Sequence, residues 1–342
     1  MTDIIAEAGI NHNGSLAIAR RLVDIAVDSS ADIVKFQMFD TEELVSPNTS
    51  TACYQERNAS TKNQYDMLKA SEIPRDDFIH IKKHCEKRGI RFLCTAYSRT
   101  DALFLKKRFG ESSVKLASIT SMEPYLYNFC LDNFDEVLLS VGFCTMKDID
   151  EILATIQRYQ NVTIMHCTSE YPTVDENANM WVLRYLSSRI GSNFIGFSDH
   201  TTSYLAGQMA VGLGIKYLEK HFSYDTNSPG PDHRVSLAQS ELYEYIHAIR
   251  RAEKLFGHPF RNKPTEGEVS NFKVMGRRLV YKRSIGIGHV LAHDDLLLIR
   301  DGMANQLRIQ SDVEGFIGKP AVCSAAAGQC FDSSHFSCDT VL

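Results

Sequence analysis

Two histidines, His200 and His221, stand in two short apolar runs that follow one another along the chain, residues 194–200 and 217–222. If these runs are adjacent parallel strands, the two imidazoles lie side by side at the same edge of the sheet. Glu7 lies in the first apolar run of the chain, residues 4–9. Its carboxylate would lie close to the two imidazoles if the last strand pairs with the first. Two imidazoles and a nearby carboxylate commonly hold a divalent metal with positions open to water and substrate. On spacing alone, the alternative is two histidines satisfied by ordinary core or surface contacts.

Two lysines form the second group of candidates. Lys35 and Lys115 lie within apolar runs that read as buried strands, and Gln37 follows Lys35 by two residues, so it shares the same face. Lysine is almost never fully buried unless it is paired, so these side chains predict a bound anion. Hydroxyl groups at neighbouring strand ends would add donors and favour phosphate; they belong to Ser118, Ser140, Thr168 and Ser198. Any one of these hydroxyls alone is more typical of a turn or a helix cap.

The elements that position these residues alternate along the chain. Short β-rich runs are followed by longer segments of helical period, such as residues 15–29, 76–88, 146–159 and 240–256, which is typical of a parallel α/β fold. The expected strands are residues 4–9, 32–37, 91–96, 114–118, 136–142, 162–168, 194–200 and 217–222. Eight such units match a (β/α)8 TIM barrel, whose chemistry sits at the carboxyl ends of the strands.

Two regions break the alternation. The connection between Gln37 and Arg75 is too long for an ordinary loop and is rich in Ser, Thr and Asn, so we interpret it as a mobile loop over the top of the barrel. After Phe256 the pattern stops. We predict a barrel domain over residues 1–257, a linker over 258–276 and a small domain of irregular β structure over 277–342. No internal repeat is evident in the sequence.

Composition narrows the class of protein. The 342 residues carry a formal net charge of -5, which argues against nucleic-acid binding. The N-terminal residues do not resemble a signal peptide, and no apolar run approaches the length of a membrane span. The nine cysteines include no Cys-x-x-Cys pair, which favours reduced thiols over disulfides or zinc. We therefore expect a cytoplasmic protein without nucleic-acid or membrane partners.

Ordered motifs along the chain resemble the sialic acid synthase family. The first is Ala6-Glu7-Ala8-Gly9-Ile10-Asn11-His12-Asn13-Gly14. Others are Val34-Lys35-Phe36-Gln37, His166-Cys167-Thr168-Ser169-Glu170-Tyr171-Pro172, Ser198-Asp199-His200-Thr201, Glu219-Lys220-His221-Phe222 and Pro229-Gly230-Pro231-Asp232-His233. The linker stretch Lys263-Pro264-Thr265-Glu266 and the final module are also similar, the latter to the antifreeze-like (SAF) domain of these enzymes. The resemblance covers essentially the whole chain.

The resemblance implies a reaction and a set of residue roles. The family condenses phosphoenolpyruvate with an open-chain N-acyl amino sugar, such as N-acetylmannosamine, to give a nonulosonic (sialic-type) acid and phosphate. His200 and His221 would hold a divalent metal, typically Mn²⁺ with Mg²⁺ or Co²⁺ as alternatives, and Glu7 would orient water. Phosphoenolpyruvate would be held by Lys35, Thr95, Lys115, Ser118, Ser140 and Ser198. The sugar would contact Gln37, Tyr171 and Asp232, and also Arg300 from the C-terminal module of the partner in a domain-swapped homodimer.

This chain departs from the family pattern at three places. Thr120 stands where the family commonly has a carboxylate, Val141 replaces a threonine, and Asp301 occupies a usual proline position after Arg300. We expect Thr120 to mark an altered sugar pocket, so the sequence leaves open which amino sugar is used. Two other functions stay open: another metal-dependent barrel aldolase or hydrolase, and a non-catalytic sugar-binding protein.

Overall fold

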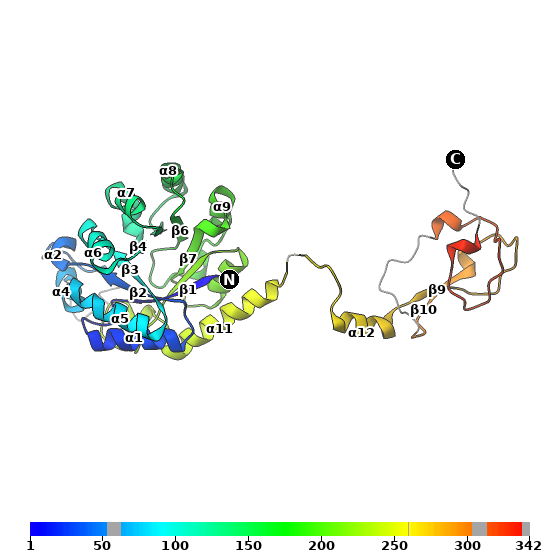
Figure 1. The fold of residues 1–342 in the computed structure, drawn as a ribbon, viewed down its shortest axis with the longest axis horizontal. Coiled ribbons are helices and arrows are strands. Elements are labelled where there is room, and N and C mark those ends of the chain that lie inside the picture. The colour runs from blue at the N-terminus through cyan, green and yellow to red at the C-terminus, as the bar shows by residue number, and fades with distance from the viewer. Residues whose placement is uncertain (53–62, 259, 303–312, 337–342) are drawn as a thin grey trace. The chain divides into compact units, whose positions relative to one another are not determined.

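The computed structural model describes residues 1–52, 63–258, 260–302 and 313–336. The chain divides into two compact units, Met1–Gly257 and His258–Leu342. The first unit is a closed barrel of eight parallel strands in chain order, with β8 pairing with β1, so the predicted TIM barrel is confirmed (Figure 1). The strands are β1 (Asp3–Gly9), β2 (Ile33–Met38), β3 (Arg91–Ala96), β4 (Ser113–Leu116), β5 (Glu136–Ser140), β6 (Val162–His166), β7 (Ile195–Asp199) and β8 (Tyr217–His221).

Alternating side chains give the barrel two cores. In β1, Ile4, Ala6 and Ala8 pack outward against the helices, whereas Ile5 belongs to a small inner cluster. That inner cluster fills the barrel interior with Ile5, Ile33, Leu93, Leu138, Met165 and Tyr217. Because successive side chains of a strand point to opposite faces, Glu7 follows Ile5 into the interior. Each strand therefore has a packed lower part and a polar end at the barrel mouth.

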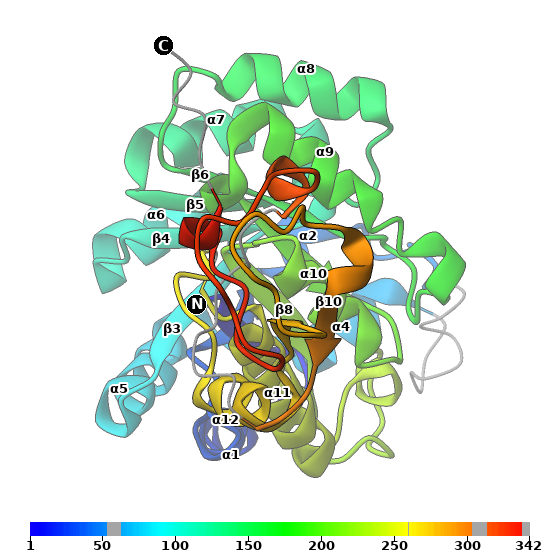
Figure 2. The same cartoon turned by 90° about the vertical axis from the view of Figure 1, so that its right-hand side faces the viewer.

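Helices surround the strands, as Figures 1 and 2 both show. They are α1 (Leu16–Asp28), α5 (Phe78–Arg88), α6 (Arg99–Phe109), α7 (Pro124–Asn133), α8 (Met146–Ile156), α9 (Trp181–Ile190), α10 (Leu205–Gly212) and α11 (Gln239–Phe256). Local sequence sets several ends: the Ser15 side chain caps α1, and Thr145 with Asp148 forms a capping box at α8. The predicted ends of helices and strands are wrong by one to three residues at several places. In particular, β4 ends at Leu116, and Ser118 begins a 3₁₀ turn, η2 (Ser118–Met122).

The segment between Gln37 and Arg75 is not a simple loop. Its described residues, 38–52 and 63–74, include two short helices, α2 (Thr41–Leu44) and α4 (Gln64–Ser71), and an isolated β-bridge joins Ser50 to Asn63. The prediction of a loop was wrong for these parts because side-chain caps start both helices in a polar stretch. Asp40 caps α2 and Asn63 caps α4. Part of the predicted mobile loop, residues 53–62, lies outside the described residues.

The predicted linker also contains regular structure. Residues 266–275 form α12 (Glu266–Met275), which begins at a capping box between Thr265 and Glu268. The predicted linker over residues 258–276 thus includes a helix of ten residues. Among the helices of the described residues, none has both the length and the apolar character that crossing a membrane requires.

The second unit has its own small core. The strands β9 (Arg278–Tyr281) and β10 (Leu296–Ile299) pair antiparallel, and six buried residues pack together: Tyr281, Ile285, Leu291, Ala321, Ala325 and Phe336. The backbone pattern of residues 282–295 recurs over residues 322–335, including the two 3₁₀ turns η6 (His293–Asp295) and η8 (Ser333–His335). The unit thus contains an internal structural repeat that the sequence analysis missed. Its assignment to the antifreeze-like type stays a prediction.

Candidate active site

The polar residues at the barrel mouth are paired across neighbouring strands. Strand register places Glu7 beside Lys35 on one side and beside His221 on the other. In the same way Thr95 is paired with Lys115, and Gln37 with Thr95. Because paired residues of neighbouring parallel strands point to the same face, these side chains converge on the interior at the carboxyl ends of the strands.

Lys35 already has protein partners. Its ammonium is 2.9 Å from Glu7 Oε1 and 3.6 Å from Glu219 Oε1, and it donates to Thr95 Oγ1 at 3.0 Å. Burial disfavours the charge, but Glu219 and Glu7 outweigh this effect and raise the pKa of Lys35. No role was predicted for Glu219, which stands in the motif Glu219-Lys220-His221-Phe222. Lys35 therefore does not need a bound anion for its charge to be balanced.

Lys115 differs from Lys35. Its ammonium donates to Ser140 Oγ at 2.5 Å and to the carbonyl of Leu116 at 3.1 Å. Within the part of the chain that the structure describes, no carboxylate forms an ion pair with it, and burial lowers its pKa. A buried ammonium with neutral partners is the kind of group that binds an anion.

Hydroxyl groups converge close to Lys115. A side chain at Gly142 would come within 2.3 Å of Ser169 Oγ and 2.7 Å of Ser118 Oγ, so glycine is required for these groups to approach. The hydroxyl of Ser198 is buried and has no hydrogen-bond partner among the described residues. A buried donor left without a partner is costly, and a ligand that accepts its hydrogen bond would remove that cost. We call Lys115, Ser118, Ser140 and Ser198 the anion cradle.

The two histidines are neighbours, as the strand order predicted. Their ring centroids are 5.7 Å apart, and the Tyr171 ring lies 4.2 Å from that of His200. His200 Nδ1 lies 2.7 Å from the carbonyl of Thr168; because a carbonyl only accepts, Nδ1 carries the proton and Nε2 keeps its lone pair. Burial lowers the pKa of His200 to about 3 and that of His221 to about 4, so both imidazoles are neutral near pH 7.

These imidazoles fit a metal with few protein ligands. His221 Nδ1 is buried and has no hydrogen-bond partner in the described structure, which is unusual for an imidazole nitrogen unless it binds a ligand. Among the described residues no set of three or more His, Cys, Asp and Glu side chains is arranged to hold a metal ion. Any metal held by His200 and His221 would take its remaining ligands from water or substrate.

A buried ion pair lies behind the histidines. Asp199 and Lys220 each precede one of them in sequence, so they point to the helix side of the barrel. Asp199 Oδ2 is 3.0 Å from the Lys220 ammonium and accepts from the Tyr245 hydroxyl of α11 at 2.9 Å. Asp199 Oδ1 accepts from the backbone and hydroxyl of Thr201. We call Asp199 and Lys220 the rear pair.

A cavity of 280 Å³ opens beside the histidines. Its polar residues include His221, Tyr171, Asp232, Gln37 and Tyr97; its apolar residues are Ile10, Phe39, Leu44, Val45, Leu68, Ile119 and Pro231. Gln37 donates to Glu7 Oε1 at 2.8 Å and accepts from the Tyr97 hydroxyl at 3.0 Å. Burial, aided by the nearby Glu7, raises the pKa of Asp232 to about 7, so this carboxyl can donate or accept near neutral pH.

Two residues that were predicted to lie at the sugar, Thr120 and Arg300, do not line this cavity. Thr120 is buried, its hydroxyl has no partner among the described residues, and it does not line the cavity, whereas its neighbour Ile119 does. That Thr120 marks an altered sugar pocket stays a prediction; within η2 it is Ile119 that lines this cavity. Arg300 lies in the second unit, directly after β10, and is exposed.

Comparison with known proteins identifies the family. A sequence model of the NeuB family matches residues 22–260. This chain belongs to the NeuB family. The predicted membership of the sialic acid synthase family is thereby confirmed.

Relatives of this NeuB chain match it over most of their length. It is 32% identical to the N,N'-diacetyllegionaminic acid synthase of Legionella pneumophila, covering 95% of this chain and 92% of that protein. It is 34% identical to the enzyme of the same name from Campylobacter jejuni, covering 94% and 96%. Among solved structures, N-acetylneuraminic acid (sialic acid) synthetase from Leptospira borgpetersenii is 28% identical, with a TM-score of 0.69 over 80% of this chain and 90% of that chain.

Proposed function

We propose that this chain is a nonulosonic acid synthase that condenses phosphoenolpyruvate with an open-chain N-acyl amino sugar and releases phosphate. The observation that carries the proposal is the anion cradle beside two neutral histidines in one barrel mouth. The names of the relatives support the product class, since each is a synthase of a sialic-type acid. The anion cradle and the cavity are different parts of the barrel mouth, so each can bind one of two substrates in a condensation.

The anion cradle suits phosphoenolpyruvate. Lys115 supplies a charge with no carboxylate partner in the described structure, and Ser118, Ser140 and Ser198 supply hydroxyl donors. Lys35 and Thr95 lie on the neighbouring strands, but the charge of Lys35 is balanced by Glu7 and Glu219. We therefore expect Lys115 to contribute more to phosphoenolpyruvate affinity than Lys35.

The cavity suits an acylated sugar. Its polar residues can pair with hydroxyl groups, and its apolar wall can cover acyl methyl groups. Two relatives above 30% identity are named for a product with two acetyl groups. We therefore propose a 2,4-diacetamido sugar as the preferred substrate, with N-acetylmannosamine as the alternative. A homodimer in which Arg300 of the partner subunit reaches this sugar stays a prediction.

The residues around the cradle would carry the chemistry. His200 and His221 would hold a divalent ion such as Mn²⁺, which supplies a Lewis acid that polarises the sugar aldehyde. The methylene carbon of phosphoenolpyruvate bonds to the aldehyde carbon, and the aldehyde oxygen takes up a proton from solvent. Water then adds to the second carbon of phosphoenolpyruvate, and Glu7, whose Oε2 is buried without a partner among the described residues, accepts one of its protons. The C–O bond to phosphate breaks last; the proton of the new hydroxyl group leaves with the phosphate, and a keto acid remains.

Phosphate release tests this proposal. The wild type should release phosphate from phosphoenolpyruvate only when an acceptor sugar is present, across a panel of 2,4-diacetamido and N-acyl mannosamine-type sugars. Lys115→Met should raise the KM for phosphoenolpyruvate by roughly ten- to hundredfold, because charge-assisted hydrogen bonds are lost. Lys216→Met is the control, since Lys216 pairs with Glu136 at the opposite end of the barrel. Turnover without phosphoenolpyruvate would favour another aldolase or a hydrolase, and sugar binding without any turnover would favour a binding protein.

A further inference from the structure

One wall of the cavity comes from helices too short to hold their own position. Leu44 ends α2, Val45 follows it, and Gln64 and Leu68 belong to α4. α2 has four residues and α4 has eight. Isolated helices of fewer than about 12–15 residues are marginal in water, so contacts elsewhere must fix these segments.

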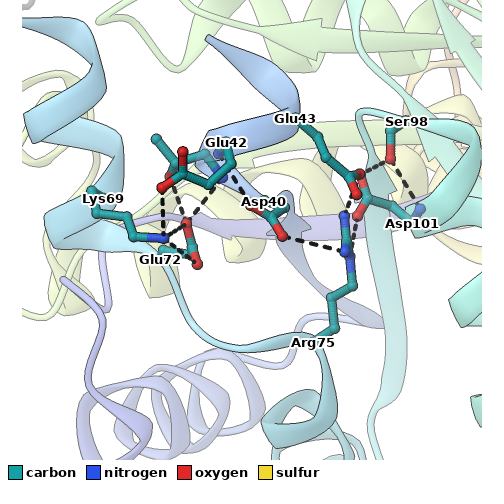
Figure 3. A network of polar contacts seen from close by, with 9 residues as sticks. Asp40, Glu42, Glu43, Lys69, Glu72, Arg75, Ser98 and Asp101 are labelled. Atoms are coloured by element: carbon teal, nitrogen blue, oxygen red, sulfur yellow. Dashed lines mark hydrogen bonds and ion pairs between the residues drawn. The ribbon is translucent and has the colours of Figure 1, made fainter. Parts of the chain in front are cut away.

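Arg75 connects α2 to the barrel. Figure 3 shows its guanidinium between three carboxylates. Nε is 2.7 Å from Asp101 Oδ1, Nη2 is 2.7 Å from Glu43 Oε2, and Nη1 is 3.4 Å from Asp40 Oδ2. Asp101 is buried in the first turn of α6, whereas Glu43 belongs to α2 and Asp40 caps it. We call these four residues the Arg75 cluster.

A second contact joins α2 to α4. Glu72, directly after α4, accepts hydrogen bonds at Oε2 from the backbone of Thr41 at 3.0 Å and from its hydroxyl at 2.6 Å. Lys69 lies 3.3 Å from the Glu72 carboxylate and 3.9 Å from that of Glu42 (Figure 3). The first residues of α2 are thus held from two sides, while the last one lines the cavity.

We propose that Arg75 is a positioning residue for sugar specificity: by holding α2 against the barrel, it sets Leu44 and Val45 as the apolar wall that the far end of the sugar meets. The identity of the ligand rests on the proposed function. Among the described residues, no member of the Arg75 cluster forms a hydrogen bond or an ion pair with the anion cradle. The proposal therefore concerns the sugar and not phosphoenolpyruvate.

Arginine is suited to this role by its shape. Its planar guanidinium presents five donors in fixed directions, so one side chain can serve three carboxylates at once. Lysine is a point charge and would keep at most part of this arrangement. Arg75→Lys should therefore hold α2 only in part, and Arg75→Met should not hold it at all.

Steady-state kinetics test the proposal. Arg75→Met should raise the KM for the sugar by roughly ten- to hundredfold, because small misplacements of a substrate-positioning group have effects of this order. The kcat and the KM for phosphoenolpyruvate should stay within about twofold of wild type. Arg88→Met is the matched control, because Arg88 forms similar pairs with Asp24 and Asp28 away from the cavity. A sugar KM within twofold of wild type in Arg75→Met would overturn the proposal.

A double-mutant cycle shows whether Arg75 acts through the wall. Expressed as free-energy changes, the increase in sugar KM of the Leu44→Ala/Arg75→Met double variant should be smaller than the sum of the increases of the two single variants. Additive increases would contradict the proposal. If Arg75→Met does not fold, Glu43→Gln removes the charge of the shorter of the two contacts toward α2 and should show the same split between the two substrates. Calorimetric binding of the sugar to the wild type and to Arg75→Met separates the two proposals. If no phosphate is released, the proposed function fails. A weaker affinity of Arg75→Met than of the wild type for the sugar would still support the role of Arg75.

Discussion

The rear pair and the Arg75 cluster are both ion-pair systems beside the candidate active site, but solvent reaches them very differently. The side chains of Lys220 and Asp199 are 2% and 0% exposed, whereas those of Arg75 and Glu43 are 17% and 43% exposed. The rear pair supports the strands that carry the histidines, and the Arg75 cluster supports a wall of the cavity. Their chemistry is similar, so burial is the main difference.

Burial determines what each system can do. Charges removed from water are tolerated only when every lone pair and proton is satisfied, and Asp199 meets this condition with Lys220, Tyr245 and Thr201. Such a pair holds one geometry and tolerates little change. In the Arg75 cluster only the carboxylates toward α2 are open to solvent: Glu43 is 43% exposed, so water can compete for it, whereas Asp101 is 1% exposed and fixes Arg75 to the barrel. The structure therefore combines a fully buried support for the histidines with a support for the sugar wall that is buried at the barrel and open to solvent on the α2 side.

The largest expected effect comes from breaking the rear pair. Lys220→Met should lower the free energy of unfolding by about 3–5 kcal/mol, because Asp199 is left as a buried charge without its cation. Lys216→Met, which breaks a half-exposed pair with Glu136, should cost about 0–1 kcal/mol. Urea unfolding monitored by circular dichroism measures both values.

The double variant sharpens this test. Asp199→Asn with Lys220→Met removes both charges, so it should lose less stability than Lys220→Met alone. Equal losses in Lys220→Met and Lys216→Met would mean that burial does not distinguish the two pairs.

A smaller effect is expected from salt on the Arg75 cluster. Raising the ionic strength from about 0.1 M to about 1 M shortens the screening length from roughly 10 Å to 3 Å, which weakens exposed pairs more than buried ones. At saturating phosphoenolpyruvate, the sugar KM of the wild type should rise roughly two- to fivefold. The sugar KM of Arg75→Met should change little, since its cluster is already broken. A parallel rise in both proteins would show that salt acts elsewhere.

The alternation of apolar and polar residues made the barrel predictable from the sequence. Period-two patterns determine which side chains enter the interior, so Glu7, Lys35 and His221 could be placed at the mouth without a structure. The closing contact of β8 with β1 follows from the strand count alone. The neighbouring positions of His200 and His221 could be predicted for the same reason.

Contacts between segments far apart in sequence could not be predicted in this way. Glu219 balances Lys35 across the barrel interior, and nothing in either strand alone indicates this. α2 and α4 lie in a polar stretch, and their positions depend on Arg75 and Glu72 rather than on an apolar face. The repeat in the second unit was missed because the backbone pattern recurs while most of the residues differ.

The smallest expected effect is the pH dependence of Glu72. Burial opposes its ionisation, but the hydrogen bonds from Thr41 and the pair with Lys69 outweigh this and lower its pKa below the ordinary 4.5. A carboxyl whose folded pKa is depressed stabilises the fold above its unfolded pKa, and this contribution is lost as pH falls through the folded pKa. The wild type should therefore exceed Glu72→Gln in stability by under about 1 kcal/mol near neutral pH, since Lys69 is half-exposed. That difference should shrink as pH falls below about 4.5, where the wild-type carboxyl becomes neutral like glutamine. Urea unfolding of both proteins across this range measures it. A difference that grows on acidification would mean that Glu72 destabilises the fold when charged, which would contradict its role in holding α2.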